Sequence, residues 1–584
     1  MRITNNMTFL FGGAAGQGIE SNGAGFAKAL ARTGLHVVAV PDYMSRIRGG
    51  HNFYQLRVSE QPILTHEEPV HMVMALDERT VEEHTRDLVP GGGMIYEQDS
   101  KVDAAALEAQ DVQPFPAPLK RIANEAGGSE VMINMAALGV AAGITGMDYE
   151  AMAGVVRQGF LKKGEDVVRA NLEVSRQGYD LGQERYAAGF DWKLGSREAP
   201  QRMTIDGNAI FAMGALLGGC KMVCAYPMTP ATPVLHWFAG HGDRYGAIIK
   251  HVEDEIAAVN MAIGANFVGV RAMAPTSGGG FSLMTEALGL AGISETPLVV
   301  FLSQRPGPST GMPTRSSQGD LLFTLFASQD EFPRLVIAPH THEETFTTGW
   351  RAFNLAEKYQ TLVVVLLDHH LSSMVRTVLP ADLHMDQVTI DRGKWLDRAA
   401  LDNLSEPYLR YKMTDDGISP RAVPGHPNAV YSATSDEHHE DGHIDSESVA
   451  TRTAMHAKRL RKFQTALADI RPPFTYGPDE AEVTLIGWGA SYGAIREAVD
   501  RANADGARVN MLHFVDIWPF PVEPVQALLN KAGRTLTVEN NAMGQMGMLL
   551  RMMTGHQVAG SILTWDGRGF TPEDVLAGLQ KEVR

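Results

Sequence analysis

The feature that most constrains the fold is a regular alternation in the middle of the chain, between about residues 204 and 377. Strand-length apolar runs recur there, and all but the last are followed by a loop and a helical stretch. This alternation predicts a doubly wound parallel sheet, because parallel strands need a crossover connection, usually a helix. The predicted strands are 222–225, 247–251, 270–274, 298–302, 335–338 and 362–367.

The length of the chain predicts several domains, since 584 residues are too many for one hydrophobic core. Before the central alternation, a strand at 7–11, a glycine-rich turn, a helix and a second strand at 35–40 predict another α/β unit, and a third begins near residue 481. We therefore expect an α/β protein with three α/β units. The predicted divisions are a first domain over 1–190, a linker over 191–203, a central domain over 204–377, an extended connector over 378–475 and a final domain over 476–584.

Charge and hydropathy exclude several classes of protein. The chain has 51 basic and 68 acidic residues and a net charge of −17, which argues against nucleic-acid binding. No apolar run reaches the roughly 18 residues of a membrane span, and the first six residues lack the features of an export signal. We expect a cytoplasmic protein that does not enter a membrane.

The cysteine content limits the redox chemistry of the chain. Cys220 and Cys224 are its two cysteines, whereas an iron–sulfur cluster normally takes four thiolates. We interpret both as small core residues of a buried strand. Any iron–sulfur cluster that serves this protein must therefore be held by another chain.

Chemically informative residues follow four of the central strands. Ligands of open parallel sheets bind beyond the carboxyl ends of the strands, where loops and helix N-termini meet. A hydroxyl, an acidic helix start, a glycine turn and an arginine should therefore lie along one edge. The four segments are 226–232, 253–258, 275–282 and 304–311.

Each of these elements also has a purely structural interpretation. Thr229 could cap a helix that begins with Pro230, and Glu255 could complement a positive helix N-terminus. The glycines of 278–280 could serve only close strand-to-helix packing, and Arg305 could pair with a structural carboxylate. Their joint presence at one edge favours a site that binds and activates an anionic substrate.

The same segments resemble motifs of the alpha subunits of 2-oxoacid:ferredoxin oxidoreductases. They read Tyr-Pro-Met-Thr-Pro at 226–230, Glu-Asp-Glu-Ile-Ala-Ala at 253–258, Thr-Ser-Gly-Gly-Gly-Phe-Ser-Leu-Met at 276–284 and Gln-Arg-Pro-Gly-Pro-Ser-Thr-Gly at 304–311. The resemblance implies a central sheet of the thiamine-diphosphate pyrimidine-binding type and a last domain like the C-terminal domain of transketolase.

The resemblance extends over the rest of the chain. Residues 1–190 are similar to the family's gamma subunit, through Gly-Gln-Gly-Ile at 16–19 and Ser-Arg-Ile-Arg-Gly-Gly at 45–50, and the segments 416–421 and 538–545 also fit. Met228 stands where the family usually has isoleucine. Ala-Thr at 231–232, in place of two serines, looks more like the 2-oxoglutarate-using branch.

The resemblance implies a reaction and roles for individual residues. The reaction is the coenzyme A-dependent oxidative decarboxylation of 2-oxoglutarate to succinyl-CoA and CO₂, with reduction of ferredoxin, and it can also run in reverse. Glu255 would hydrogen-bond the aminopyrimidine of thiamine diphosphate, Arg305 would hold the substrate carboxylate, and Thr229 would bind the substrate oxygens or the intermediate. The remaining predicted cofactor contacts are Tyr226, Pro227 and Met228.

What the sequence lacks indicates a partner. The family's diphosphate and Mg²⁺ site needs Gly-Asp-Gly with a downstream asparagine, and the sequence contains no Gly-Asp-Gly. Since cluster cysteines are missing too, the resemblance implies a beta subunit that carries Mg²⁺ and a [4Fe-4S] cluster. It further implies a dimer of alpha–beta heterodimers that reduces ferredoxin.

Several weaker candidates lie outside the central motifs. Arg46, Arg48 and His51 could reach the distal carboxylate of 2-oxoglutarate or a phosphate of coenzyme A, or form a solvated basic loop. Ser309 and Thr310 are further candidates for binding substrate or coenzyme A. We expect no metal site in this chain, because the histidines of 438–443 lie in what we interpret as a solvated acidic connector.

The glycines of 13–18, with Asp42 after the second strand, leave three roles open for this turn. It could bind a nicotinamide dinucleotide, it could be a structural or partner-docking turn, or it could take part in coenzyme A or substrate access. Three alternatives to the preferred function follow. The chain could act on pyruvate or another 2-oxoacid, it could be a nucleotide-binding dehydrogenase, or it could be a non-catalytic scaffold that has kept the fold.

Overall fold

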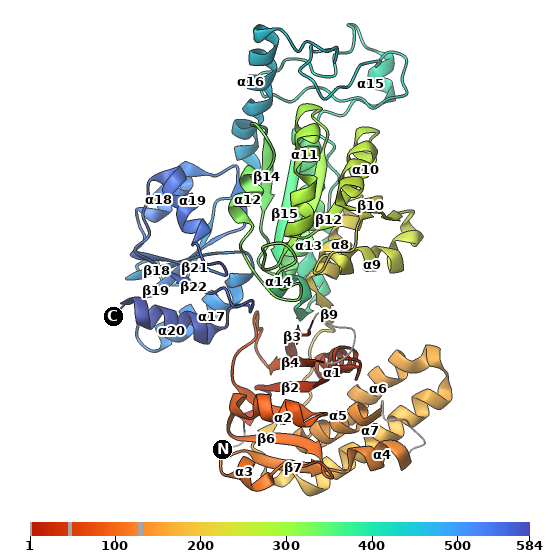
Figure 1. Ribbon diagram of the computed structural model, residues 1–584, viewed down its shortest axis with the longest axis vertical. Coiled ribbons are helices and arrows are strands. Elements are labelled where there is room, and N and C mark those ends of the chain that lie inside the picture. Colours follow the sequence, from red (N-terminus) through yellow and green to blue (C-terminus); the bar gives the residue numbers. More distant parts are fainter. Residues whose placement is uncertain (1–2, 45–49, 126–131, 584) are drawn as a thin grey trace. The chain divides into compact units, whose positions relative to one another are not determined.

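The computed structural model describes residues 3–44, 50–125 and 132–583, and the chain divides into two compact units (Figure 1). One unit comprises Met1–Asp206 with Ser373–Asp382, and the other comprises Gly207–Ser372 with Leu383–Arg584. None of the described helices combines the length and the apolar character that crossing a bilayer requires. The α/β fold class predicted from the sequence is confirmed in both units.

The N-terminal unit is built on an eight-stranded mixed sheet with the order β7-β6-β5-β2-β4-β3-β16-β9. Its strands are β2 (Met7–Ala14), β3 (His36–Asp42), β4 (His51–Ser59), β5 (Val70–Ala75), β6 (Leu88–Glu97), β7 (Gln113–Ala117), β9 (Met203–Asp206) and β16 (Val375–Val378). A separate pair joins β1 (Ile3–Thr4) to β8 (Trp192–Lys193). The helices are α1 (Ile19–Arg32), α2 (Glu78–His84), α3 (Ala104–Glu108), α4 (Leu119–Glu125), α5 (Ile133–Thr145), α6 (Tyr149–Phe160) and α7 (Glu165–Arg185).

Two strands of this sheet come from the segment 204–377 that we expected to form the central domain. β16 pairs antiparallel with both β3 and β9, so the chain adds two short strands to one edge of the N-terminal sheet. Both strands are only four residues long, and the backbone pairing reveals where they belong. The central domain therefore begins, as a packed unit, with Gly207 rather than with the preceding strand.

The strand order also bears on dinucleotide binding. In a dinucleotide fold the first two strands lie side by side in parallel, which places the acidic residue after the second strand near the glycine turn. Here β4 lies between β2 and β3 and runs antiparallel to both. Asp42, at the end of β3, is therefore one strand too far from the glycine turn for the expected ribose contact.

The second unit contains the predicted parallel sheet. Its order is β11-β10-β12-β13-β15-β14-β20, and each predicted strand is present with its ends within two residues of the expected positions. The elements are α8 (Gly207–Leu217), β10 (Met222–Ala225), α9 (Thr232–His241), β11 (Ile248–His251), α10 (Glu255–Phe267), β12 (Ala272–Thr276), α11 (Gly278–Ile293), β13 (Leu298–Gln304), α12 (Leu321–Phe326), β14 (Arg334–Ile337), α13 (His342–Tyr359), β15 (Leu362–Asp368) and α14 (His369–Ser373).

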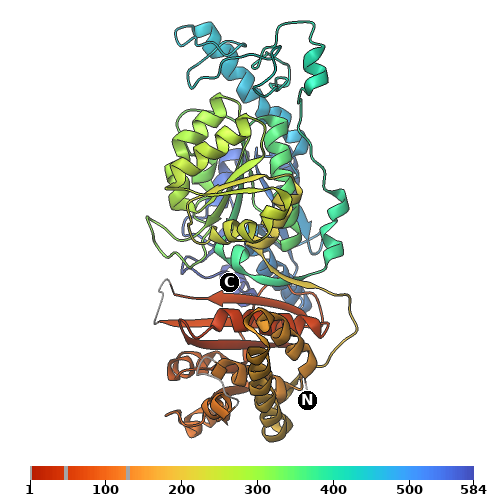
Figure 2. The same ribbon diagram turned by 90° about the vertical axis from the view of Figure 1, so that its right-hand side faces the viewer.

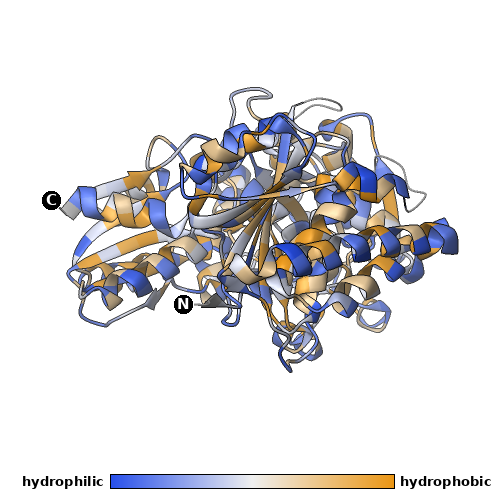
Figure 3. Ribbon diagram, turned by 90° about the horizontal axis from the view of Figure 1, so that it is seen from below, coloured by the Kyte–Doolittle hydropathy of each residue, from blue (hydrophilic) through white to orange (hydrophobic). Residues whose placement is uncertain are grey.

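Helices cover both faces of this sheet, as Figures 1 and 2 show. α10, α11 and α12 share one apolar core with the strands, whereas α8 and α13 pack on the opposite face. β13 and β15 are buried along their full lengths, as expected for strands covered on both faces. In Figure 3 the helices carry hydrophobic and hydrophilic stretches side by side, which is typical of helices with one buried face.

The C-terminal domain adds a five-stranded sheet with the order β17-β19-β18-β21-β22. β20 also comes from the C-terminal domain, but it joins the edge of the central sheet, antiparallel to β14. The central and C-terminal domains share one apolar core. A bidentate ion pair from Arg351 of α13 to the buried Asp516 of β20, at 2.7 and 2.6 Å, reinforces this junction. The elements are β17 (Phe474–Tyr476), β18 (Val483–Trp488), α17 (Tyr492–Ala504), β19 (Val509–Phe514), β20 (Asp516–Trp518), α18 (Val522–Leu529), β21 (Arg534–Glu539), α19 (Gln545–Thr554), β22 (Gly560–Leu563) and α20 (Pro572–Val583).

The connector is held to the central domain by buried charges. It has little regular structure apart from α15 (Arg398–Asp402) and α16 (Val449–Ala466). Lys458 and Lys462 of α16 each place an ammonium group 2.6 Å from the fully buried carboxylate of Glu295. Burial opposes ionisation of Glu295, but the two ammonium groups outweigh burial and hold its pKa well below the usual range.

We predict that Lys458→Met lowers the free energy of unfolding by about 3 kcal/mol, because it leaves a buried carboxylate short of one partner. Urea denaturation of the purified chain measures the change. The Glu295 carboxylate has a lower pKa folded than unfolded, so its contribution is present above the unfolded pKa of about 4.3 and is lost as the pH falls towards the folded value. Lys412→Met removes an exposed lysine of the connector, and an equally large effect there would contradict the prediction.

Candidate active site

Glu255 occupies the first position of α10, at the carboxyl edge of the central sheet. The preceding residue, Asp254, caps the helix by accepting a hydrogen bond from the Ala257 amide at 2.7 Å. Only 3% of Glu255 is exposed, and its Oε1 has no hydrogen-bond partner among the residues that the structure describes. Because another carboxylate already caps the helix, that oxygen stays available to a ligand.

The surroundings of Glu255 alter its acidity. Burial raises the pKa of the carboxyl, while the guanidinium of Arg305 acts in the opposite direction. A raised pKa favours the protonated form, in which a carboxyl can donate a hydrogen bond as well as accept one. Glu255 can therefore exchange a proton with a ring nitrogen placed against it.

The glycine turn at the start of α11 makes room for this carboxyl. A Cβ atom on Gly280 would lie 2.6 Å from the Glu255 Cγ and 2.7 Å from its Oε1. It would also lie 2.1 Å from the Thr276 Oγ1. The turn thus serves close packing, as its structural interpretation proposed, and the group packed against it is the Glu255 side chain itself.

The other two motif loops meet at the same edge. The Arg305 side chain donates a hydrogen bond from Nη1 to the Thr229 carbonyl oxygen at 2.7 Å. A Cβ built on Gly279 would lie within 4.0 Å of the Met228 Cε and 3.9 Å of the Ser309 carbonyl oxygen. The structure therefore brings all four predicted segments together.

The remaining predicted site residues differ in how deeply they are buried, and two of them lie outside the described residues. Pro227 and Met228 are half-buried beside Thr229, while Tyr226, Ser309 and Thr310 are exposed. Arg46 and Arg48 lie outside the described residues. His51 belongs to the N-terminal unit, is 3% exposed and is hydrogen-bonded to His84, so it is not part of a solvated basic loop.

Comparisons with known proteins match this chain over nearly its whole length. Residues 213–458 match the family described as pyruvate flavodoxin/ferredoxin oxidoreductase, thiamine diphosphate-binding, while 8–181 match pyruvate ferredoxin/flavodoxin oxidoreductase and 481–575 match core domain II of pyruvate:ferredoxin oxidoreductase. The 2-oxoacid:ferredoxin oxidoreductase subunit alpha of a Sulfolobus species is 32% identical, over 99% of this chain and 97% of its own. The chain belongs to the alpha-subunit family of the 2-oxoacid:ferredoxin oxidoreductases.

Two further relatives have names or descriptions that refer to 2-oxoglutarate. The 2-oxoglutarate:ferredoxin oxidoreductase from Magnetococcus marinus, solved with 2-oxoglutarate, coenzyme A and succinyl-CoA bound, matches with a TM-score of 0.92 and 32% identity over 99% of this chain and 100% of that chain. The 2-oxoglutarate oxidoreductase subunit KorA of Mycobacterium tuberculosis is 28% identical over 94% of this chain and 87% of its own. The family resemblance seen in the motifs is confirmed.

In this alpha-family chain, the loop after Arg305 is anchored to the C-terminal domain. Gln318 exchanges hydrogen bonds with the backbone of Asn540, at 2.7 and 2.9 Å, and donates to the Trp488 carbonyl oxygen at 2.9 Å. Gln545 donates to the Gly319 carbonyl oxygen at 2.7 Å and accepts from the Leu322 amide at 2.9 Å. Sequence reasoning noted the segment 538–545 as a family motif but did not foresee this role.

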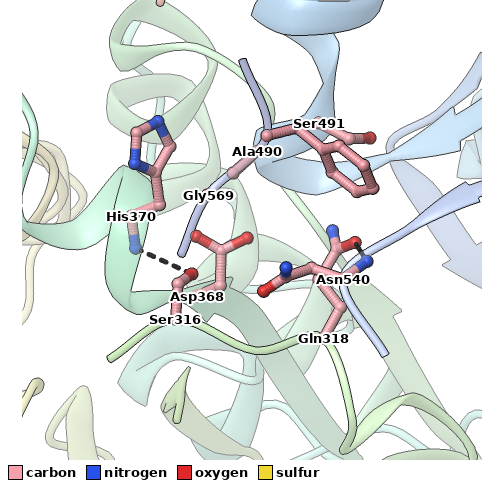
Figure 4. Close-up of a pocket in the computed structure, with 9 residues that line it drawn as sticks. Ser316, Gln318, Asp368, His370, Ala490, Ser491, Asn540 and Gly569 are labelled. Carbon is pink, nitrogen blue, oxygen red and sulfur yellow. Dashed lines mark hydrogen bonds between the residues drawn. The ribbon is translucent and has the colours of Figure 1, made fainter. Parts of the chain in front are cut away.

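A small cavity of about 10 Å³ lies beside this anchor, between the end of β15 and loops of the C-terminal domain (Figure 4). Asp368 lines it, and burial raises the pKa of its carboxyl to about 6 although the Leu371 amide donates to it at 3.0 Å. The space suffices for one water molecule and not for a 2-oxoacid. Figure 4 shows Asp368 beside Ser316 and His370, with the Gln318–Asn540 contact on the other side.

Asp320, which sequence reasoning also missed, lies at the end of the anchored loop. A Cβ on Gly278 would lie 2.4 Å from its Oδ2, so the carboxyl faces the start of α11. Burial raises the pKa of Asp320 to about 6. No local motif marks this residue, because its position depends on the path of the whole loop.

We predict that Gly280→Ala lowers turnover by roughly 100-fold while the chain stays folded, because its methyl group would displace the Glu255 carboxyl. Steady-state kinetics of the complex with its partner, alongside circular dichroism, measures both effects. Gly264→Ala is the matched control, since a Cβ there meets no atom within 4 Å and the residue lies in the middle of α10. Unchanged activity in Gly280→Ala would show that the position of Glu255 does not matter.

Proposed function

We propose that this chain is the alpha subunit, with a fused gamma-like domain, of a 2-oxoglutarate:ferredoxin oxidoreductase. The proposed reaction converts 2-oxoglutarate and coenzyme A to succinyl-CoA and CO₂ and reduces ferredoxin. The buried Glu255 carboxyl, with an oxygen that no described residue satisfies, is the observation that carries the catalytic part of the proposal. The named relatives support the choice of substrate.

The residues present fit thiamine diphosphate. When bound, this cofactor supplies the nucleophilic carbon and the electron sink that decarboxylation of a 2-oxoacid requires. Glu255 would hold a proton at the aminopyrimidine ring nitrogen, a role that its raised pKa and its unpaired Oε1 suit. Tyr226, Pro227 and Met228 would line the side of the cofactor, since they precede Thr229 on the same loop.

Arg305 and Thr229 would bind the substrate. The Arg305 fork matches a carboxylate bidentately. Its Nη1 donates a hydrogen bond to the Thr229 carbonyl, and a guanidinium has further N–H donors that a ligand can use. Arg305 is half-buried, so a carboxylate held there is partly shielded from water and bound more strongly than at an exposed arginine. The Thr229 hydroxyl would donate a hydrogen bond to an oxygen of the substrate.

We further propose a beta subunit that holds Mg²⁺, the diphosphate and a [4Fe-4S] cluster, in a dimer of alpha–beta heterodimers. Burial raises the pKa of Cys220 to about 12 and that of Cys224 to about 11, so both thiols stay protonated and are poor ligands for iron. The sequence also has no Gly-Asp-Gly segment. The diphosphate and redox parts of the reaction therefore need another chain.

A row of neighbouring helices offers a surface for such a partner. α10 contacts α11, Phe281 of α11 packs edge-to-face on Phe323 of α12 at 5.3 Å, and α12 contacts α19. Each helix exposes apolar side chains, which is typical of interaction surfaces when they gather on adjacent elements. The exposed residues are Ile256, Leu283, Phe323, Phe326, Met548 and Met552.

The domain boundaries follow from the same proposal. We assign a gamma-like domain to 1–190, a linker to 191–203, a pyrimidine-binding domain to 204–377, a connector to 378–475 and a transketolase C-terminal-like domain to 476–584, with β9 and β16 added to the gamma-like sheet. A cytoplasmic location is part of the proposal. Ser309, Thr310 and the segment around Arg46 and Arg48 remain candidates for contact with substrate or coenzyme A.

Pyruvate is the second candidate substrate, because all three matching family descriptions name pyruvate enzymes. We predict that the chain, co-purified with its beta subunit, reduces a low-potential dye anaerobically with 2-oxoglutarate, coenzyme A and thiamine diphosphate, and much less with pyruvate. Dye absorbance measures both rates. Faster reduction with pyruvate would keep the reaction class and replace the substrate, and no thiamine-dependent activity with any 2-oxoacid would contradict the whole proposal.

We predict that Glu255→Gln lowers the turnover number on the order of 100-fold or more, since an amide cannot transfer the proton that a carboxyl shares with the ring nitrogen. The same assay measures the rate, and cofactor binding is followed by the thermal shift with added thiamine diphosphate. Glu523→Gln, an exposed residue of α18, is the matched control. A Glu255→Gln complex with full activity would support the scaffold alternative.

A further inference from the structure

Two histidines and a glutamate meet in the N-terminal unit, among them His51, a candidate from the sequence for contact with 2-oxoglutarate or coenzyme A. His51 begins β4, and its Nε2 lies 2.7 Å from the Nε2 of His84, the last residue of α2. The Glu83 Oε2 lies 3.8 Å from the same His51 nitrogen. One ligand atom from each residue falls within 4.8 Å of the others, close enough to surround one ion.

The cluster lies where the sheet brings distant segments together. His51 pairs with Ala14 at the carboxyl end of β2, and β5, the parallel neighbour of β2, leads into α2. A Cβ on Gly12 would lie 2.5 Å from the Thr80 Cγ2 and 3.3 Å from the His51 Cε1, so a glycine is needed for α2 and the imidazole to approach the strand. The site is therefore built by close packing of a strand against a helix, and its two histidines are 33 positions apart in the sequence.

Both imidazoles are buried, and an outer carboxylate orients one of them. His84 and His51 are buried, at 6% and 3% exposed, and the His84 Nδ1 lies 2.7 Å from the Asp87 carboxylate. That contact fixes the Nδ1–H tautomer and turns the Nε2 lone pair towards His51, as outer carboxylates do for metal-binding histidines.

Glu83 provides an oxygen from the open side. Its Oε1 accepts a hydrogen bond from the Arg79 side chain at 2.6 Å, which leaves Oε2 directed towards the histidines. The Glu83 side chain is 40% exposed, so an ion could enter from solvent past it. Two carboxylates offset the positive charge of Arg79. Asp77 caps the N-terminus of α2, and Asp87 lies in the turn that follows α2.

We propose that His51, His84 and Glu83 bind one divalent transition-metal ion of the Zn²⁺ type. Two neutral imidazoles and one carboxylate form a ligand set that Zn²⁺ accepts, with metal–ligand distances of about 2.0–2.2 Å and a fourth position left for water. The two imidazole nitrogens lie 2.7 Å apart and would have to separate by about 0.6 Å, to the spacing of about 3.3 Å between ligands of a tetrahedral ion. The sequence motifs gave no sign of this site, because its ligands follow no metal-binding spacing.

The test uses the full chain purified with a chelator and titrated with Co²⁺, whose visible absorption reports four- or five-coordinate nitrogen and oxygen ligation. We expect one Co²⁺ per chain, displaced by Zn²⁺. Glu83→Gln should weaken binding at least tenfold, whereas Glu82→Gln, the exposed neighbour on α2, should bind as the native chain does. Asp87→Asn should weaken it by about 10-fold through the orientation of His84.

Each outcome decides the proposal. Binding that weakens in Glu83→Gln and Asp87→Asn but not in Glu82→Gln supports it. The absence of stoichiometric Co²⁺ binding, or equal affinity in Glu83→Gln and Glu82→Gln, overturns it. Circular dichroism shows that the variants are folded, and Glu83 is exposed enough for its substitution to leave the core intact.

Discussion

The buried carboxyl of Glu255 constrains how the helices of the central domain pack around it. Glu255 is buried against a glycine turn, and one of its oxygens finds no partner among the described residues. An unsatisfied buried polar group costs about 1–3 kcal/mol, so the surrounding structure must hold it in place. The parallel sheet does this by setting α10 and α11 side by side, with Gly280 as the point where they nearly touch. Ligand binding, and not folding, can supply the missing hydrogen bond.

Much of the central domain could be predicted from the sequence because its strands are local and strongly apolar. β13 and β15 are buried throughout, so their apolar runs stand out without any knowledge of the partners. The motif residues could be placed at one edge for the same reason, since every parallel strand delivers its following loop there. The positions of the strands alone therefore predict that Thr229, Glu255 and Arg305 lie at the same edge.

The parts that sequence reasoning missed depend on pairings between distant segments. β16 and β20 are short, and each joins a sheet of a different domain from the one that its neighbours in the sequence form: β16 pairs with β9, and β20 pairs with β14. The pairing of Gln318 with Asn540 spans 222 residues, and His51 meets His84 only because β4 enters the sheet between β2 and β3. These contacts are decided by the tertiary packing of both partners, which no single segment encodes.

The anchoring of the loop after Arg305 limits how this loop can change between related chains. The loop leaves β13 in the central domain, but Gln318 and Gln545 tie its far end to the C-terminal domain. A substitution in the C-terminal domain can therefore shift the loop that follows Arg305, although it lies in another domain. Evolution or design that exchanges this loop between relatives has to carry its C-terminal counterpart with it, so the two segments form one inherited unit although more than 200 residues separate them.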